Sequence, residues 1–270
     1  MKLELPSQLE NFGITAFSVT GQGTPIVLIH GVGMRQQVWA PQVRDLGRDF
    51  KVITYDMLGH GQSDVPPEGV QLTCYAEQLL ALLDHLGIQR AHVIGHSMGA
   101  LIALEFALNY PQRCLRVAAL NAVFCRTPEQ SEAVIQRASS LVTSGILAGL
   151  DATLARWFDP ACEDTHQQIS AQIRDFLCQV DPVGYRRTYE LFASSDRMHL
   201  TRLKSMEVPV LFMTGQNDVN SQPSMSRAMA DLVPVASLEI LADARHMMTL
   251  THAADINQRL HSFLSGPDIT

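Results

Sequence analysis

The segment Gly95-His96-Ser97-Met98-Gly99 places a serine between two glycines in the pattern G-x-S-x-G. An apolar run at His92–Ile94 precedes it, and a stretch of helical period begins near Ala100. This strand–turn–helix context holds a serine on a tight turn, where the start of the helix favours developing negative charge. The chemistry expected of Ser97 is therefore nucleophilic attack on a carbonyl carbon.

A serine hydroxyl needs a base that takes its proton and a carboxylate that orients this base. A strand expected at Val210–Thr214 leads into Asp218, and another that ends at Leu241 leads into His246. After a serine on such a turn, the acid and the histidine follow in this order on loops behind later strands. We therefore expect Ser97, Asp218 and His246 to be nucleophile, acid and base.

Other ionisable residues fit this chemistry less well. Asp243 lies so close to the expected base in sequence that we expect it to cap the turn. His252 and His261 fall at the start and inside of the final predicted helix, where packing or surface roles are usual. His92 and His96 straddle a strand and a turn, so they would not share a face as metal ligands do. No H-E-x-x-H motif occurs, and we expect no metal.

The tetrahedral intermediate of acyl transfer needs two backbone N–H donors for its oxyanion. The first is expected from Met98, which follows the nucleophile at the start of a helix. The second is expected from Val32, in the loop His30-Gly31-Val32-Gly33 that follows the strand Ile26–Ile29. An oxyanion hole formed by these two amides is the interpretation favoured for this loop.

The same glycine-containing loop also resembles the start of a dinucleotide-binding fingerprint, with Asp56 as the acid for the ribose. That fingerprint requires a third glycine where this chain has Gln36. We therefore expect no nucleotide, and no cofactor of any kind.

Composition excludes several classes of function. The formal net charge of -7 comes without any block of Lys or Arg, which disfavours binding to nucleic acid or to an anionic membrane. The first residues lack the pattern of a signal peptide and no apolar stretch is long enough to cross a bilayer, so a cytoplasmic location is expected. The five cysteines include no C-x-x-C pair, so neither disulfides nor zinc are indicated. The oligomeric state stays open, a homo-oligomer included.

Short apolar runs alternate with stretches of helical period in the first and last parts of the chain, as in a parallel sheet with crossover helices. The expected strands are Ile26–Ile29, Lys51–Tyr55, His92–Ile94, Leu115–Leu120, Val210–Thr214 and Leu238–Leu241. The expected helices of these parts are Tyr75–Leu86, Ala100–Leu108, Ser224–Leu232 and Ala253–Leu264.

The middle of the chain, from about Phe124 to Leu200, contains no convincing strand. Its expected helices, which prolines 128, 160 and 182 separate, are Ala133–Val142, Leu154–Phe158, Gln167–Val180 and Tyr185–Phe192. We therefore predict an α/β fold whose core comprises residues 1–123 and 201–270. A helical cap, residues 124–200, is inserted between the two halves of a mostly parallel sheet.

These residues resemble the α/β-hydrolase fold superfamily over nearly the whole chain. The signatures are the His30–Gly33 loop, the segment Tyr55–Ser63, the turn at Ser97, and the two loops with Asp218 and His246. The second signature usually reads D-x-R-G-x-G-x-S, and here residue 58 is a leucine instead of the arginine. Because that arginine is more structural than chemical, the expected activity stands.

Within the superfamily the chain looks most like the 3-oxoadipate enol-lactonase group and its esterase relatives. This likeness rests on Ala155-Arg156-Trp157-Phe158, on Asp181–Tyr185 and on the layout of the cap. The resemblance implies a serine hydrolase of aromatic-compound catabolism, which cleaves a small carboxylic ester, lactone or related carbonyl substrate through an acyl-enzyme. It also suggests that Arg156 reaches a substrate carboxylate; a surface or salt-bridge role for Arg156 stays equally open.

The cap and the apolar residues Trp39, Met98, Trp157 and Met247 are expected to close a dry pocket over the sheet, with His30 and Gly31 beside the substrate. Carbon–carbon or enamide C–N bond hydrolases of ring-cleavage products share the triad and remain an alternative. Several carbon–carbon hydrolases carry a tryptophan just after the histidine, where this chain has methionine. A non-catalytic small-ligand receptor on the same fold is an alternative from another class, as is cofactor-free oxygenase or perhydrolase chemistry.

Overall fold

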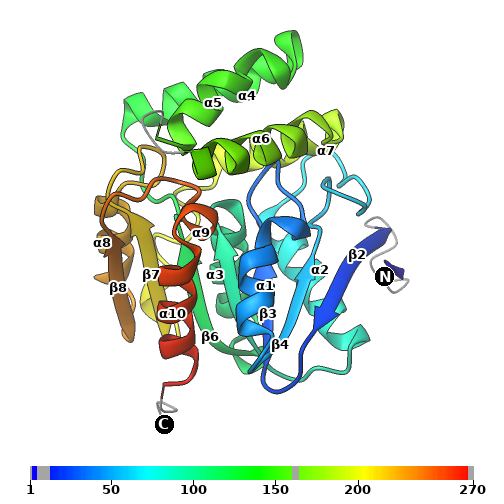
Figure 1. Ribbon diagram of the computed structural model, residues 1–270, viewed down its shortest axis with the longest axis vertical. Helices are drawn as coiled ribbons and strands as arrows, with labels where there is room; N and C mark the ends of the chain where they lie inside the picture. The colour runs from blue at the N-terminus through cyan, green and yellow to red at the C-terminus, as the bar shows by residue number, and fades with distance from the viewer. Residues whose placement is uncertain (1, 5–12, 160–163, 267–270) are drawn as a thin grey trace.

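The computed structural model describes residues 2–4, 13–159 and 164–266, whose strands form one twisted sheet (Figure 1). The strand order is β1-β2-β4-β3-β5-β6-β7-β8; β1 pairs antiparallel with β2 and β2 antiparallel with β4, and all other pairs are parallel. The strands are β1 (Lys2–Glu4), β2 (Ile14–Thr20), β3 (Pro25–Ile29), β4 (Lys51–Tyr55), β5 (Ala91–His96), β6 (Cys114–Leu120), β7 (Val210–Gly215) and β8 (Ala236–Leu241).

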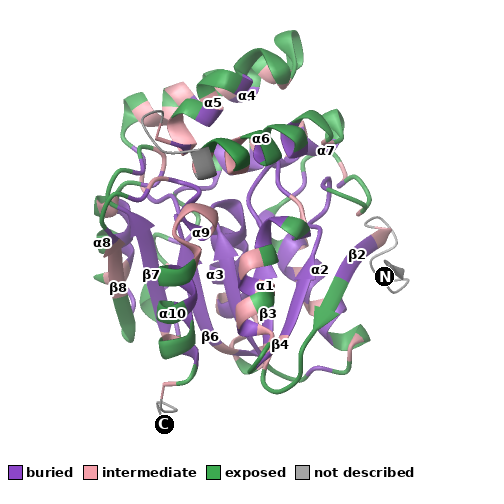
Figure 2. Ribbon diagram, viewed as in Figure 1, coloured by how far each residue is buried: buried purple, intermediate pink, exposed green. Residues whose placement is uncertain are grey.

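Helices cover both faces of this sheet. One face carries α1 (Ala40–Leu46) and α10 (Ala253–Leu264), which contact each other, while α2 (Leu72–His85) and α3 (Met98–Asn109) pack together on the other. The short helix α9 (Met248–Thr251) precedes α10, and α8 (Pro223–Ala230) packs on β7 and β8. Strands enclosed on both faces must be apolar on both. Figure 2 accordingly shows the central strands as buried.

All six predicted strands are present, with ends that differ from the prediction by at most two residues. The predicted α/β-hydrolase architecture, a mostly parallel sheet between helices, is confirmed. The prediction missed β1, β2 and α1. The strands β1 and β2 are antiparallel additions at one edge of the sheet, outside the alternation of strand and helix that guided the prediction.

Four helices lie between β6 and β7 in sequence and cover the carboxyl ends of the strands (Figure 1). We call them the cap: α4 (Pro128–Ser144), α5 (Leu150–Trp157), α6 (Asp164–Cys178) and α7 (Pro182–Ser194). Pro128 and Pro182 begin helices, because proline fits the first turn, where no N–H partner is needed. Pro160 and Cys162 lie outside the described residues. We propose residues 124–200 as the cap region and residues 1–123 with 201–270 as the core.

The start of α7 rests directly on the turn after β4. A Cβ atom added to Gly184 would lie 2.5 Å from the Cα of Gly59, so the two backbones meet where neither can carry a side chain. Gly59 also has a φ of +80°, which favours glycine. This contact fixes one end of the cap over the loops that follow β3 and β4.

Candidate active site

Ser97 sits on a strained turn between the end of β5 and the start of α3. Its φ of 57° and ψ of -117° are outside the regions that non-glycine residues favour. A Cβ on Gly95 would lie 1.9 Å from the carbonyl oxygen of Gly99, and one on Gly99 would lie 2.2 Å from that of Ile29. Both glycines of the motif are therefore required by close backbone contacts, and the turn presents Ser97 at the carboxyl edge of the sheet.

The loops after β7 and β8 bring Asp218 and His246 together. The Nδ1 atom of His246 lies 2.8 Å from Oδ2 of Asp218, which also accepts a hydrogen bond of 2.8 Å from the amide of Asn121. The other carboxylate oxygen accepts hydrogen bonds from the backbone N–H groups of Asn220 (2.8 Å) and Ser221 (3.1 Å). The carboxylate is thus held at both oxygens and faces the imidazole.

Electrostatics keep this carboxylate ionised. Burial by itself raises the pKa of Asp218, but the nearby His246 and the hydrogen bonds to the carboxylate outweigh it and bring the pKa to about 2. An ionised carboxylate at Nδ1 favours the tautomer in which Nδ1 carries the proton and Nε2 is free to accept one.

His96, the last residue of β5, tethers the backbone of the histidine loop. Its Nε2 atom lies 2.8 Å from the carbonyl oxygen of His246, to which the N–H donates. Burial, followed by the neighbouring His246, lowers the pKa of His96 to about 3. His96 is therefore neutral at physiological pH and acts as a fixed donor.

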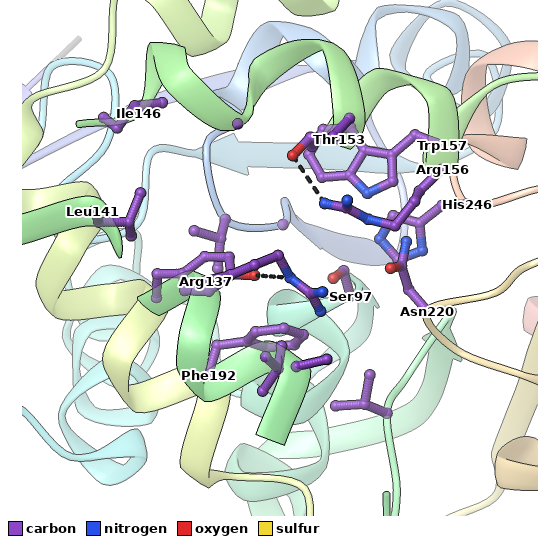
Figure 3. A pocket seen from close by; sticks show the side chains of 18 of the residues that line it. Ser97, Arg137, Leu141, Ile146, Thr153, Arg156, Trp157, Phe192, Asn220 and His246 are labelled. Atoms are coloured by element: carbon purple, nitrogen blue, oxygen red, sulfur yellow. Dashed lines mark hydrogen bonds between the residues drawn. The ribbon is translucent and has the colours of Figure 1, made fainter. Parts of the chain in front are cut away.

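Ser97 and His246 line the same cavity, which has a volume of about 670 Å³ and lies between the sheet and the cap. Figure 3 shows both residues at one end of it. Gly31 lies against Ser97, since a Cβ at Gly31 would be 3.1 Å from the Cβ of Ser97. Val32 also lines the cavity, and Met98 is the first residue of α3. Of the two residues expected to donate to an oxyanion, Met98 directly follows Ser97, and Val32 follows Gly31 in the cavity wall.

Two buried histidines hold the loop that contains Val32. Nε2 of His30 accepts from the N–H of Met57 (3.1 Å), and Nε2 of His60 accepts from the N–H of Gly33 (2.9 Å). Burial lowers the pKa of His30 to about 4, and burial together with the neighbouring His30 lowers the pKa of His60 to about 3. Both rings are neutral near pH 7, and each accepts a hydrogen bond that joins the loop after β3 to the loop after β4.

The cap side of the cavity is cationic. Arg137 of α4 and Arg156 of α5 extend toward the end that holds the serine (Figure 3). Nε of Arg137 donates to the Tyr189 hydroxyl at 3.2 Å, and Nη2 of Arg156 donates to Thr153 Oγ1 at 2.9 Å. Among the described residues neither guanidinium forms an ion pair, and no Asp or Glu lines the cavity.

A third arginine in the wall is already neutralised. Arg126 forms a buried ion pair with Asp196, with 3.4 Å between Nη1 and Oδ1. Burial, followed by the charge of Arg137, lowers the pKa of Arg156. Arg137 and Arg156 therefore leave about two positive charges that nothing described in the cavity balances.

Comparison with known proteins identifies the family. A family model of the alpha/beta hydrolase fold matches residues 24–144. The "(E)-2-((N-methylformamido)methylene)succinate hydrolase" of Acinetobacter baylyi is 33% identical over 95% of this chain and 96% of its own. The chain belongs to the α/β-hydrolase family. The 3-oxoadipate enol-lactonase 1 of the same organism is 27% identical over 89% of this chain and 88% of its own.

The solved structures agree with this assignment. The enol-lactonase from Burkholderia xenovorans LB400 superposes with a TM-score of 0.87 at 29% identity, over 94% of this α/β-hydrolase and 97% of its own chain. The suspected likeness to the enol-lactonase group is thereby confirmed, and the chain is an enzyme of the hydrolase family.

Four of the residues expected near a substrate line the cavity of this hydrolase, and three do not. Arg156, Trp157, Gly31 and Met247 line it. His30, Trp39 and Met98 are fully buried and are not among the described lining residues. Trp39 ends a short helical turn, Gln36–Trp39, that packs into the core. The rings of His30 and His60 contact each other and connect two loops of the core.

Sequence reasoning missed Asn121, His96 as a tether, and Arg137. Asn121 follows β6 at the edge where the other functional loops emerge, and its position directly after a strand was a usable signal. Arg137 lies in the cap helix α4, and nothing in its sequence neighbourhood distinguishes it from a surface arginine.

No group of three or more His, Cys, Asp or Glu residues in the described segments could hold a metal ion. None of the helices described is long and apolar enough to cross a membrane.

Proposed function

We propose that this α/β-hydrolase cleaves an acyl bond in a small substrate with two acidic groups, through an acyl-enzyme on Ser97. The observation that carries the proposal is one cavity with a serine on a strained turn and a His–Asp pair at its end, opposite two unbalanced guanidiniums. Guanidinium groups bind carboxylates in bidentate geometry, and buried positive charge favours an anionic ligand.

In the proposed reaction, Oγ of Ser97 attacks the substrate carbonyl carbon while Nε2 of His246 takes the hydroxyl proton. Asp218 holds the imidazole by Nδ1 and stabilises the imidazolium that forms. The N–H groups of Val32 and Met98 stabilise the oxyanion. Collapse of the intermediate breaks the bond to the leaving group, which receives the proton from His246. Water then attacks the acyl-enzyme by the same route and releases Ser97.

The two arginines would position the substrate rather than take part in bond breaking. Arg137 and Arg156 each have donors directed into the cavity, and an anion there would offset the burial and the repulsion from Arg137 that lower the pKa of Arg156. Each charge-assisted hydrogen bond contributes about 1.5–3 kcal/mol to binding. The same pair of charges would disfavour neutral and cationic substrates.

The names of two relatives support this substrate class. The relative at 33% identity is named for a substituted succinate with an N-acyl group, and the enol-lactonase is named for a lactone derived from 3-oxoadipate. We therefore propose hydrolysis of a carbonyl–heteroatom bond in a carboxylate-bearing substrate such as a ring-cleavage product. The higher identity favours an N-acyl enamine over an enol ester as the bond that is cleaved.

A matched substrate panel tests the proposal. It pairs an N-acylaminomethylene succinate and a carboxylate-bearing enol-lactone with their neutral methyl esters, alongside p-nitrophenyl acetate. We expect kcat/KM for at least one acidic substrate to exceed that of its neutral ester by about 100-fold or more. A preference for the neutral compounds would refute the substrate class, and turnover by Ser97→Ala would refute the mechanism. Binding without any turnover would support a receptor.

A further inference from the structure

The cap touches the histidine loop directly at the end of α5. The indole of Trp157 stacks on the imidazole of His246, with ring centroids 5.6 Å apart and planes at 29°. Beside it, Nη1 of Arg245 donates to the carbonyl oxygen of Ala155 at 3.4 Å. Two successive residues of the histidine loop thus contact the last turn of α5, and Figure 3 shows Trp157 and His246 at this end of the cavity.

The other sides of the His246 ring are already occupied. Asp218, from the loop after β7, faces Nδ1 at 2.8 Å, and the ring of His96, from β5, lies 4.9 Å away at 53°. Ser97 lines the same end of the cavity from the turn before α3. From α5, Arg156 is the charged neighbour and Trp157 supplies the ring face.

We propose that Trp157 is a positioning residue for His246, which fixes the plane of the imidazole and stabilises its protonated form. This inference rests on the proposed function, in which His246 is the base. An aromatic face within about 6 Å of a cation attracts it, and Trp is the strongest of the aromatic residues in this respect. During catalysis the imidazolium forms when Ser97 gives up its proton, so the attraction stabilises the transition state and the intermediate more than the neutral base that precedes them.

The contact would also link substrate binding to the base. Arg156 and Trp157 are consecutive residues at the end of α5. A substrate anion held by Arg156 therefore stabilises the same helical turn that carries the indole. The base is fully supported only while this part of the cap is seated on the core.

Removal of the indole should weaken the protonated imidazole. The acidic limb of the kcat/KM profile should then move to lower pH by about 0.5–1 unit in Trp157→Leu, with kcat lowered about three- to tenfold. Trp157→Phe, which retains a weaker aromatic face, should lie between the two. Phe158→Leu loosens the end of α5 without removing the stack, and should leave the midpoint unchanged. An unchanged midpoint in Trp157→Leu would overturn the electrostatic role.

Fluorescence tests the stack without any need for turnover. The chain has two tryptophans, and Trp39→Phe leaves Trp157 as the sole indole. Because a protonated imidazole quenches a stacked indole, emission should fall as the pH is lowered from 8 to 5, with the midpoint of the acidic limb. His246→Asn should abolish this transition. Neither neighbour accounts for it, because the pKa of His96 is about 3 and that of Asp218 about 2.

The two hypotheses fail in different ways. Emission that does not depend on pH, or a transition that persists in His246→Asn, would overturn the inference about Trp157 even if Ser97 proves to be the nucleophile. Turnover by Ser97→Ala would refute the proposed function, although a His246-dependent transition would still support the stack.

Discussion

The two walls of the cavity differ in how completely their polar groups are paired. On the sheet side, both oxygens of Asp218 are hydrogen-bonded, and His96 holds the backbone of His246. On the cap side, Arg137 and Arg156 are bonded only to neutral hydroxyls of described residues. A carboxylate that is hydrogen-bonded at both oxygens keeps a fixed geometry, whereas unbalanced charge is available to a ligand.

This difference assigns separate tasks to the two walls. Under the proposed function, the sheet side would supply the preorganised reaction centre, because its turns and loops are anchored at the ends of buried strands. The cap side would supply substrate recognition. Changes on the sheet side should therefore lower kcat, and changes on the cap side should mainly alter kcat/KM between substrates.

The largest effect on kcat is expected at Asp218, the proposed acid. Asp218→Asn should lower kcat by about 10³–10⁴ with little change in KM, because the amide no longer favours the tautomer with a free Nε2. Steady-state kinetics on the preferred substrate measure it. Asp243→Asn, which alters the other acidic residue before His246, is the matched control and should retain near-normal kcat. A large loss in Asp243→Asn with normal Asp218→Asn would invert the assignment of the acid.

Replacement of a cap arginine should lower activity on acidic substrates much more than on neutral ones. Arg137→Gln and Arg156→Gln should each lower kcat/KM for an acidic substrate by about 10- to 100-fold and leave p-nitrophenyl acetate within about twofold. Competition between the two substrates in one assay measures the ratio directly. Arg186→Gln is the control, because Arg186 is a half-buried cap arginine that is paired with Glu190 and does not line the cavity. Equal losses on both substrates would show that the arginines support the fold instead of binding an anion.

Three buried histidines of the site should make the protein less stable in acid. His30, His60 and His96 have pKa values of about 4, 3 and 3 in the folded chain, against 6.5 when unfolded. Unfolding therefore takes up protons below about pH 6.5, and the free energy of unfolding decreases as the pH is lowered below this value. The loss at pH 5 is about 2 kcal/mol per histidine. Urea titrations at pH 7 and pH 5 measure it.

A variant isolates one of these histidines. His60→Gln keeps an acceptor for the N–H of Gly33 and removes a titrating group, so the difference in stability between pH 7 and pH 5 should shrink by about a third. His85→Gln, at an exposed position, should not change it. An unchanged pH dependence in His60→Gln would mean that other groups dominate acid unfolding.

The contrast between the walls also explains what the sequence could predict. The turn at Ser97 is encoded locally, because only glycine fits at positions 95 and 99, where each residue lies in close contact with another part of the backbone. Asp218 and His246 follow strands, and the carboxyl ends of parallel strands meet at one edge of a sheet. Chain order and local pattern therefore suffice to propose all three as one site, and Asp218 and His246 do lie in hydrogen-bonding contact.

For the cap, the sequence could not predict which side chains point into the cavity, and the reason is physical. Its helices are specified by amphipathic periodicity, which gives their existence but not the direction in which a polar side chain points. Arg137 and Arg186 are both cap arginines, and only packing between helices sends one into the cavity. Trp39 shows the opposite error, since it was expected to close the pocket and lies in the core.

Covalent labelling of the serine tests the central claim most directly. Intact mass spectrometry and peptide mapping after treatment with a fluorophosphonate should show one adduct per chain, on Ser97, formed rapidly in the wild type. In His246→Ala and Asp218→Asn, labelling should be slower by at least about 100-fold, because the hydroxyl lacks its base or the oriented tautomer. Labelling at another residue, or equal rates in all three proteins, would contradict an activated Ser97.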